Sequence, residues 1–161
     1  MIPLRSLLVV LVMHASPCSA LAEELRGRVV GIADGDTLTL LTDAQTAIRV
    51  RLSEIDTPER RQPYGSRARE ALSNLAYGRH ARVDVVDEDR YGRTVGRVRI
   101  GATDVNAEMV RRGAAWVYRR YSRDPALLWI EAEARAARRG LWALPEAQRV
   151  PPWEWRTAGR H

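Results

Sequence analysis

Five short segments rich in β-branched residues and leucine, separated by turn-forming residues, constrain the fold of this chain most strongly. They are residues 25–33, 37–42, 48–52, 81–86 and 94–100. Asp34-Gly35, between the first two segments, favours a tight hairpin turn. The third segment alternates apolar and basic residues and runs into Pro58, which ends a strand. The pattern therefore predicts five β-strands.

Helical patterns follow the third and the fifth of these segments. The helical ranges are residues 63–77, 104–112 and 124–139. In the first range Ala68, Leu72 and Leu75 share one face. The other two ranges begin with an Asp cap and end at Gly113 and Gly140. This order predicts a mainly β fold with α (α+β), a five-stranded OB-fold β-barrel with about three helices.

The N-terminal residues are typical of a cleaved signal peptide. Arg5 precedes the apolar run at 7–13, and Ala20-Leu21-Ala22 supplies a small-residue cleavage site. We expect cleavage before Glu23 and a secreted or periplasmic protein. The apolar run is too short to cross a bilayer, so we expect no membrane anchor after cleavage. Lipid attachment at Cys18 is the alternative interpretation, disfavoured by the proline beside it.

Removal of residues 1–22 leaves a length that suits one domain, which we assign to residues 23–145. Residues 146–161 form a tail rich in Trp and Pro, which we expect to be extended and to dock through its indoles.

The formal net charge is +6, and all 26 basic residues are arginine. Arginine suits phosphate contacts. An arginine-favouring genome explains most of these positions better, so charge alone indicates nucleic acid only weakly.

Three motifs concentrate acids and arginines in loops beside the predicted barrel. They are Asp-Gly-Asp-Thr at 34–37, Arg-Leu-Ser-Glu-Ile-Asp-Thr-Pro-Glu at 51–59 and Asp-Arg-Tyr-Gly-Arg at 89–93. Each alone is an ordinary turn or strand end, but core packing requires none of these charges. In this order the motifs resemble those of the staphylococcal nuclease (thermonuclease) family. The resemblance runs from about residue 28 to residue 142.

The resemblance implies a hydrolase, an endonuclease and phosphodiesterase that uses Ca²⁺, acts on DNA and RNA, and leaves 3′-phosphates. It implies Asp36 and Asp56 as carboxylate metal ligands and Thr57 as a carbonyl ligand, and such hard oxygen donors suit Ca²⁺. Asp34 is either an outer-shell residue or simply the turn acid.

The same resemblance implies that Glu59 is the general base that assists attack by water. Arg51 and Arg93 correspond to the family's two phosphate-binding arginines, whose bidentate contacts would strengthen as transition-state charge develops. Tyr91 corresponds to a tyrosine that touches a terminal phosphate, and Tyr121 lies near where a base would stack.

Some features depart from the family or remain open. The loop at residues 60–63 is shorter than in the type member, so substrate range and rate do not transfer. Tyr118 is either a substrate contact or a core residue, and Trp116, Trp129 and Trp142 are expected to pack in the interior.

We expect a monomer without a stable protein partner. The rival hypothesis is a non-catalytic OB-fold module of the cell envelope that binds nucleic acid, disfavoured because the acids and arginines are all present.

Overall fold

A computed structural model describes residues 23–159 of the chain. The predicted signal peptide, its cleavage site and Cys18 therefore lie at or beyond the edge of the described residues, and their assignment stays a prediction. Within the described range no helix combines the length and apolarity needed to cross a membrane.

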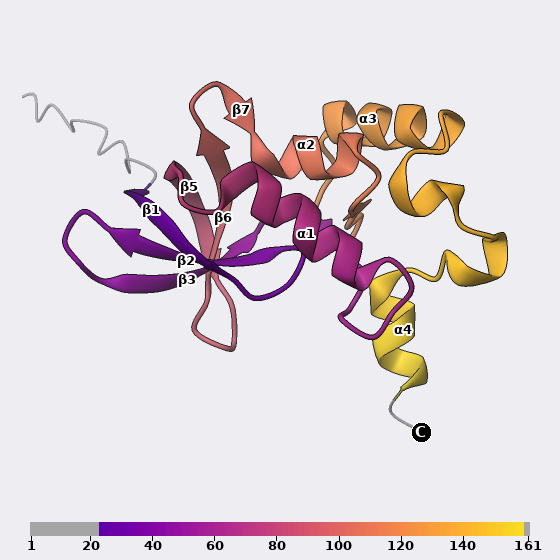
Figure 1. Cartoon of the computed structure of the whole chain (residues 1–161), viewed down its shortest axis with the longest axis horizontal. Helices are drawn as coiled ribbons and strands as arrows, with labels where there is room; N and C mark the ends of the chain where they lie inside the picture. The colour runs from indigo at the N-terminus through magenta and orange to yellow at the C-terminus, as the bar shows by residue number, and fades with distance from the viewer. Residues whose placement is uncertain (1–22, 160–161) are drawn as a thin grey trace, which may run out of the picture.

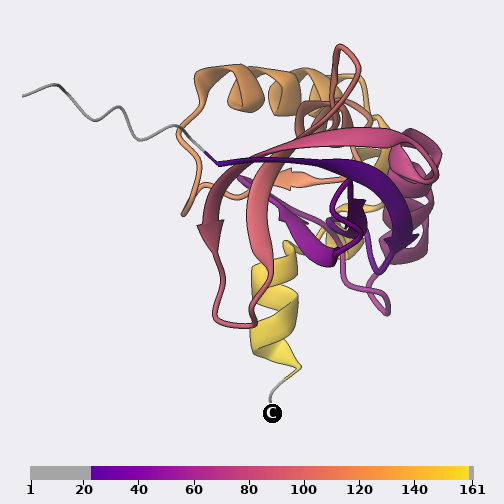
Figure 2. The same cartoon turned by 90° about the vertical axis from the view of Figure 1, so that its left-hand side faces the viewer.

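Five long strands form a closed barrel. They are β1 (Glu24–Ile32), β2 (Thr37–Thr42), β3 (Ala47–Leu52), β5 (His80–Glu88) and β6 (Thr94–Ile100). The strands β3, β2, β1, β5 and β6 are antiparallel neighbours in that order, and a parallel pairing of β3 with β6 closes the ring. Figure 2 shows this curved sheet from the side. The five predicted strands and the OB-fold barrel are confirmed.

Three shorter strands complete the β structure of the described residues. β7 (Thr103–Asp104) pairs with the end of β6, whereas β4 (Ile55–Asp56) pairs with β8 (Trp116–Val117) in a separate two-stranded sheet. The second pair matters for the site because it holds Asp56 just beyond the end of β3.

Four α-helices occur between residues 23 and 159, one more than expected. They are α1 (Gly65–Ala76), α2 (Val105–Arg111), α3 (Pro125–Ala136) and α4 (Pro152–Ala158), with short 3₁₀ helices at η1 (Gly140–Ala143) and η2 (Glu146–Gln148). The predicted caps are present, since Asp104 accepts from the amide of Ala107 and Asp124 from that of Ala126. In Figure 1, α1 crosses beside the barrel, and α2 and α3 lie together at one end.

The core fills the barrel and the space beneath the helices. Fully buried strand residues mostly alternate with more accessible ones, as the period of two requires. The core residues of the strands are Val29, Leu38, Leu40, Val50, Leu52, Val83 and Val98, and those of the helices include Leu72, Met109 and Leu127. A rigid, well-packed support of this kind can hold loop residues in a defined geometry.

Two expectations from the sequence were wrong, one about the form of the tail and one about the burial of Trp129. The tail is not extended throughout, because Pro152 begins α4, where proline is well suited to the first helical turn. Trp129 is 63% exposed, because Leu127 and Ile130 turn toward the core and leave it on the outer side of α3. Trp116 and Trp142 are buried as expected.

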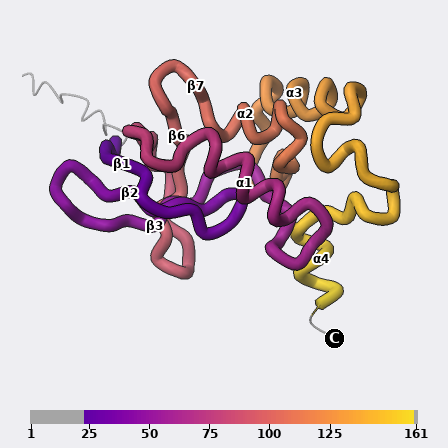
Figure 3. The backbone as a smooth tube through the Cα atoms, viewed as in Figure 1, coloured from indigo at the N-terminus to yellow at the C-terminus, as the bar shows by residue number. Residues whose placement is uncertain are grey.

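The tail nevertheless returns to the body of the protein. Figure 3 follows it from α3 through η1 and η2 down to α4, which lies beside the loop that precedes α1. The side chain of Gln62 in that loop donates to the carbonyl of Val150. The ring of Trp153 stacks on Tyr118 with a centroid distance of 5.0 Å and packs edge-on against Trp116.

Candidate active site

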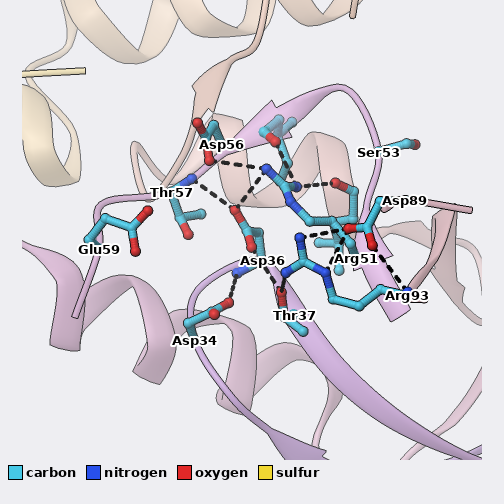
Figure 4. A network of polar contacts seen from close by, with 12 residues as sticks. Asp34, Asp36, Thr37, Arg51, Ser53, Asp56, Thr57, Glu59, Asp89 and Arg93 are labelled. Atoms are coloured by element: carbon cyan, nitrogen blue, oxygen red, sulfur yellow. Dashed lines mark hydrogen bonds and ion pairs between the residues drawn. The ribbon is translucent and has the colours of Figure 1, made fainter. Parts of the chain in front are cut away.

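The predicted metal-binding and catalytic residues come from three loops, the end of β3 and the short strand β4. Asp34 and Asp36 belong to the β1–β2 turn, Arg51 to the end of β3, Asp56 to β4, and Thr57 and Glu59 to the segment after it; Arg93 ends the β5–β6 turn. The parallel pairing of Arg51 with Val95 sets β3 beside β6. In Figure 4 Asp36 lies at the centre, with Glu59 on one side and Arg93 on the other.

Asp36 links the β1–β2 turn to the segment after β4. Its Oδ2 accepts from the amide of Thr57 at 3.1 Å, and its Oδ1 accepts from the hydroxyl of Thr37 at 3.1 Å. The two segments approach so closely that a Cβ on Gly35 would lie 2.7 Å from Oγ1 of Thr57. Glycine at this position is therefore a requirement of packing, beyond the turn that the sequence indicated.

Arg51 joins the two aspartates that the sequence assigned to the metal. Its Nη2 lies 3.0 Å from Oδ1 of Asp56 and 3.4 Å from Oδ2 of Asp36. Its Nη1 donates to the carbonyls of Leu52 and Ile55. The guanidinium is thus held in place by neutral and charged partners, and the Arg51 side chain is only 15% exposed.

A buried asparagine positions the turn that carries these groups. The side-chain amide of Asn106 donates to the carbonyl of Ser53 at 2.9 Å, and its oxygen accepts from the amide of Val98 at 3.0 Å. Because Asn106 is fully buried, both bonds are shielded from water. The turn between β3 and β4 is therefore tied to β6 and α2 at once.

The carboxylates of the site are crowded. Burial raises the pKa of Asp34 to about 6, and the negative charge of Asp36 adds to the effect. Burial and Asp36 likewise raise the pKa of Asp56 to about 6, against the opposing influence of hydrogen bonds and charge from Arg156 and Arg51. For Asp36 burial is outweighed by Arg51 and the hydrogen bonds it accepts, so its pKa is lowered. Burial and the charge of Asp36 thus favour the protonated form of Asp34 and Asp56, while Asp36 itself stays ionised.

Glu59 lies at the exposed edge of the site. The loop after it is built of tight turns, with the amide of Glu59 donating to Oε1 of the buried Gln62 and the amide of Gln62 donating back to the carbonyl of Glu59. The side chain of Glu59 is 42% exposed. Its Oε1 accepts from Nη1 of Arg156 at 2.7 Å. The loop therefore fixes the backbone of Glu59, and the tail holds its carboxylate.

Arg93 is held by an acid of its own turn. Its Nε and Nη2 both lie 2.7 Å from Oδ2 of Asp89, and its Nη1 donates to the hydroxyl of Thr37 at 3.3 Å. The contact with Thr37 links Arg93 to the residue that also bonds Asp36. Arg93 and Asp36 thus belong to one hydrogen-bonded network.

The two predicted substrate tyrosines are both exposed, Tyr91 by 68% and Tyr121 by 66%. The ring of Tyr91 faces the guanidinium of Arg93, whose Cζ lies 5.5 Å from the ring centroid. Tyr121 lies in the loop after β8, edge-on to Tyr118 at 4.9 Å. Tyr118 is engaged by Trp153 and is partly buried, which agrees with the packing alternative.

Two residues of the site were missed by the sequence interpretation. Asp89 was part of a quoted motif, and its spacing of four from Arg93 across a turn was the signal that could have assigned it a role. Arg156 bonds Asp56 and Glu59 from about a hundred positions further along the chain. No local pattern announces a contact over that separation.

The closed barrel with paired carboxylates and arginines at its mouth defines a class of protein, an OB-fold domain with a site for phosphate chemistry. A family model described as "Staphylococcal nuclease homologue" matches residues 49–144, more than half of the chain. The chain therefore belongs to the staphylococcal nuclease family, and it is a nuclease, a hydrolase of phosphodiester bonds.

Individual relatives agree with this assignment. The chain is 50% identical over 153 residues to Protein ParB of Escherichia coli, covering 88% of this chain and 83% of that protein. It is 44% identical over 149 residues to a micrococcal nuclease of Shigella flexneri, covering 86% and 84%. It is also 44% identical over 137 residues to an uncharacterized endonuclease of Escherichia coli O157:H7, covering 84% and 88%.

Proposed function

We propose that this chain is an exported, Ca²⁺-dependent nuclease that hydrolyses phosphodiester bonds of both DNA and RNA and leaves 3′-phosphates. The observation that carries the proposal is the pair Asp36 and Asp56, two carboxylates that share Nη2 of Arg51 at 3.4 and 3.0 Å. A pair of acids and an arginine at one point supply groups for both a cation and a phosphate.

The residues fit a hard divalent cation. The ligands that the protein would supply are the carboxylates of Asp36 and Asp56 and the carbonyl of Thr57. Between residues 23 and 159 no group of three His, Cys, Asp or Glu side chains forms a ready-made metal cluster, so this set is incomplete. Burial, and then the negative charge of Asp36, raise the pKa of Asp34 and of Asp56, and a bound cation would favour the charged form of both groups. Such an incomplete oxygen set suits Ca²⁺, which tolerates water and substrate oxygens as its remaining ligands.

The remaining residues have separate roles in the proposed reaction. When bound, the cation offsets the charge of the phosphate and favours ionisation of water. Glu59, exposed at the edge of the site, accepts the proton of the attacking water. Arg93 and Arg51 donate to the phosphate oxygens as negative charge develops on them. Tyr91 and Tyr121 contact the ends and bases of the substrate without sequence preference.

A cleavage assay tests the proposal. Purified chain beginning at Glu23 is incubated with plasmid DNA and with RNA, with Ca²⁺ or with a calcium chelator. We expect both substrates to be cut with Ca²⁺ and neither with the chelator. Cleavage that survives thorough chelation, or that requires Zn²⁺, would refute the calcium assignment. Binding without any cleavage would favour the alternative of a non-catalytic nucleic-acid-binding module.

Export is tested separately. Arg5, the apolar run at 7–13 and Ala20-Leu21-Ala22 support removal of the first 22 residues. The intact mass of protein recovered from the envelope or the medium should correspond to a chain that begins at Glu23. A mature form that begins at Met1 would contradict export, and a lipid mass on Cys18 would show anchoring in its place.

A further inference from the structure

Arg156 of α4 occupies the carboxylates on which the proposed reaction depends. Its Nη2 lies 2.7 Å from Oδ2 of Asp56, and its Nη1 donates to Oδ1 of Asp56 at 3.3 Å and to Oε1 of Glu59 at 2.7 Å. One guanidinium thus joins a proposed cation ligand to the proposed general base. Arg156 also lies outside residues 49–144, the part of the chain that the family model matches.

With the contact from Arg51, these contacts engage both oxygens of the buried carboxylate of Asp56. Arg51 bonds Oδ1, and Arg156 bonds both Oδ1 and Oδ2. The side chain of Asp56 is 2% exposed, so neither oxygen is open to solvent. A cation approaching Asp56 would meet the positive guanidinium of Arg156 within a few ångströms, and like charges at that range in a partly buried site repel strongly.

The element that carries Arg156 is weakly attached. Among the seven residues of α4 only Pro152 is buried, and Arg156 itself is 36% exposed at its side chain. The main apolar contact is the ring of Trp153 against Tyr118 and Trp116. A short helix held by one buried proline, one aromatic ring and one ion-pair group opens at little cost compared with the barrel.

We propose that Arg156 is a built-in counter-ion of the unloaded site, which competes with the divalent cation for Asp56 and Glu59, so that cation binding displaces Arg156 and loosens α4. The inference rests on the proposed cation dependence of the nuclease. It assigns the C-terminal helix a function in setting the cation concentration at which the site loads.

Calcium titration calorimetry without nucleic acid tests the competition. Wild type is compared with Arg156→Gln, which removes the charge. Arg149→Gln is the matched control, because Arg149 lies in the same tail and donates only to a backbone carbonyl, that of Leu144, at 2.8 Å. We expect Arg156→Gln to lower the Kd for Ca²⁺ at least about tenfold, the scale of one charge-assisted hydrogen bond. Arg149→Gln should leave the Kd within about twofold of wild type, because its charge is not on the carboxylates.

A second variant separates the position of α4 from the charge of Arg156. Trp153→Ala removes the apolar contact of α4 and leaves every carboxylate intact, so it too should tighten Ca²⁺ binding. In wild type, added Ca²⁺ should speed amide hydrogen exchange over residues 152–158. These two results do not depend on turnover, and they keep the inference testable if Arg156→Gln is poorly folded.

The outcomes distinguish this inference from the proposed function. If Arg156→Gln binds Ca²⁺ as wild type does, or more weakly, the competition is refuted while calcium dependence stands. If neither wild type nor Arg156→Gln binds Ca²⁺ at millimolar concentration, the calcium proposal fails and the competition fails with it. Unchanged exchange of α4 on loading would likewise overturn the displacement of Arg156.

Discussion

Asp89 holds Arg93 through a single carboxylate oxygen, which lies 2.7 Å from both Nε and Nη2 of the guanidinium. The other oxygen of Asp89 accepts from the amides of Tyr91 and Arg93, so the turn and the side chain share one acceptor group. Arg93 gains from this pairing the defined orientation that a bidentate donor to phosphate requires.

Removal of the Arg93 side chain should destroy turnover. If its guanidinium acts where transition-state charge develops, Arg93→Ala should lower kcat by ~10² to 10³, the scale of one preorganised donor. Arg93→Lys keeps the charge but loses the fork geometry and should be impaired as well. The measurement is kcat and KM on DNA with Ca²⁺, together with a thermal melt. A folded Arg93→Ala protein that cuts at the wild-type rate would show that Arg93 is not catalytic.

Asp89 is a positioning residue for Arg93, and its substitution should reduce activity only in part. Asp89→Asn keeps an acceptor for the turn amides but weakens the pairing with Arg93. We expect kcat to fall by about 10- to 10²-fold with little change in KM, because the arginine remains but is no longer oriented. A combined Asp89→Asn, Arg93→Ala protein should be no slower than Arg93→Ala. Additive losses in that double variant would mean that Asp89 acts independently.

Glu59→Gln should separate chemistry from folding. The amide matches the carboxylate in shape and cannot accept a proton, so kcat should fall by ~10² or more, as expected for loss of a general base. The pairing with Arg156 is partly exposed and should matter little for stability. The check is kcat on DNA with Ca²⁺, together with a thermal melt of the variant. A folded Glu59→Gln protein that cuts at the wild-type rate would show that Glu59 is not the base.

A methyl group on Gly65 should disturb Glu59 without touching its side chain. A Cβ at this position would lie 1.9 Å from the carbonyl oxygen of Glu59, and backbone cannot yield as a flexible side chain does. We expect Gly65→Ala to lose about 1–3 kcal/mol of unfolding free energy, the usual cost of overpacking, and much of its activity. Asn74→Ala, an exposed change in the same helix, is the control. A Gly65→Ala protein as stable and active as wild type would contradict the close approach.

Without a bound cation, the free energy of unfolding should fall as pH rises, because of Asp34 and Asp56. Asp34 and Asp56 have pKa values raised from an ordinary 3.8 to about 6, so the folded protein retains protons there that the unfolded chain has already released. Their contribution to stability is therefore present below pH 4 and lost as pH rises through about 6. Urea unfolding with chelator at several pH values between 4 and 7 should show a decline, and Asp34→Asn should reduce it. A rise over this range would contradict the raised pKa values.

The sequence predicted the barrel well because its signals are local. Alternation in residues 48–52 and 94–100, and the turn at Asp34-Gly35, are visible within a few positions, and the corresponding strands lie within a residue or two of the expected ranges. The pairing of β4 with β8 had no such signal, because each strand has only two residues. These strands exist through tertiary contacts rather than through a pattern of their own.

The site was predictable to a different extent. Asp36, Asp56, Thr57 and Arg51 were named from short motifs, and the structure brings them into contact. Their roles in metal binding and catalysis remain predictions. The helical form of the tail and the contact of Arg156 with the site could not be predicted from the sequence. They depend on the packing of Trp153 against Tyr118, a contact between distant parts of the chain. Proline and tryptophan at 151–155 are compatible with either an extended or a helical segment.

The parallel seam between β3 and β6 couples the appearance of activity to a late event in folding. Arg51 lies in β3 and Arg93 immediately precedes β6, and these two strands meet at this seam, where Val50 pairs with Thr94. Contacts between such distant residues form slowly, after local helices and hairpins. A refolding chain should therefore regain helix signal before it can cleave anything. Recovery of cleavage would time the closure of the barrel itself, with the enzyme serving as its own reporter.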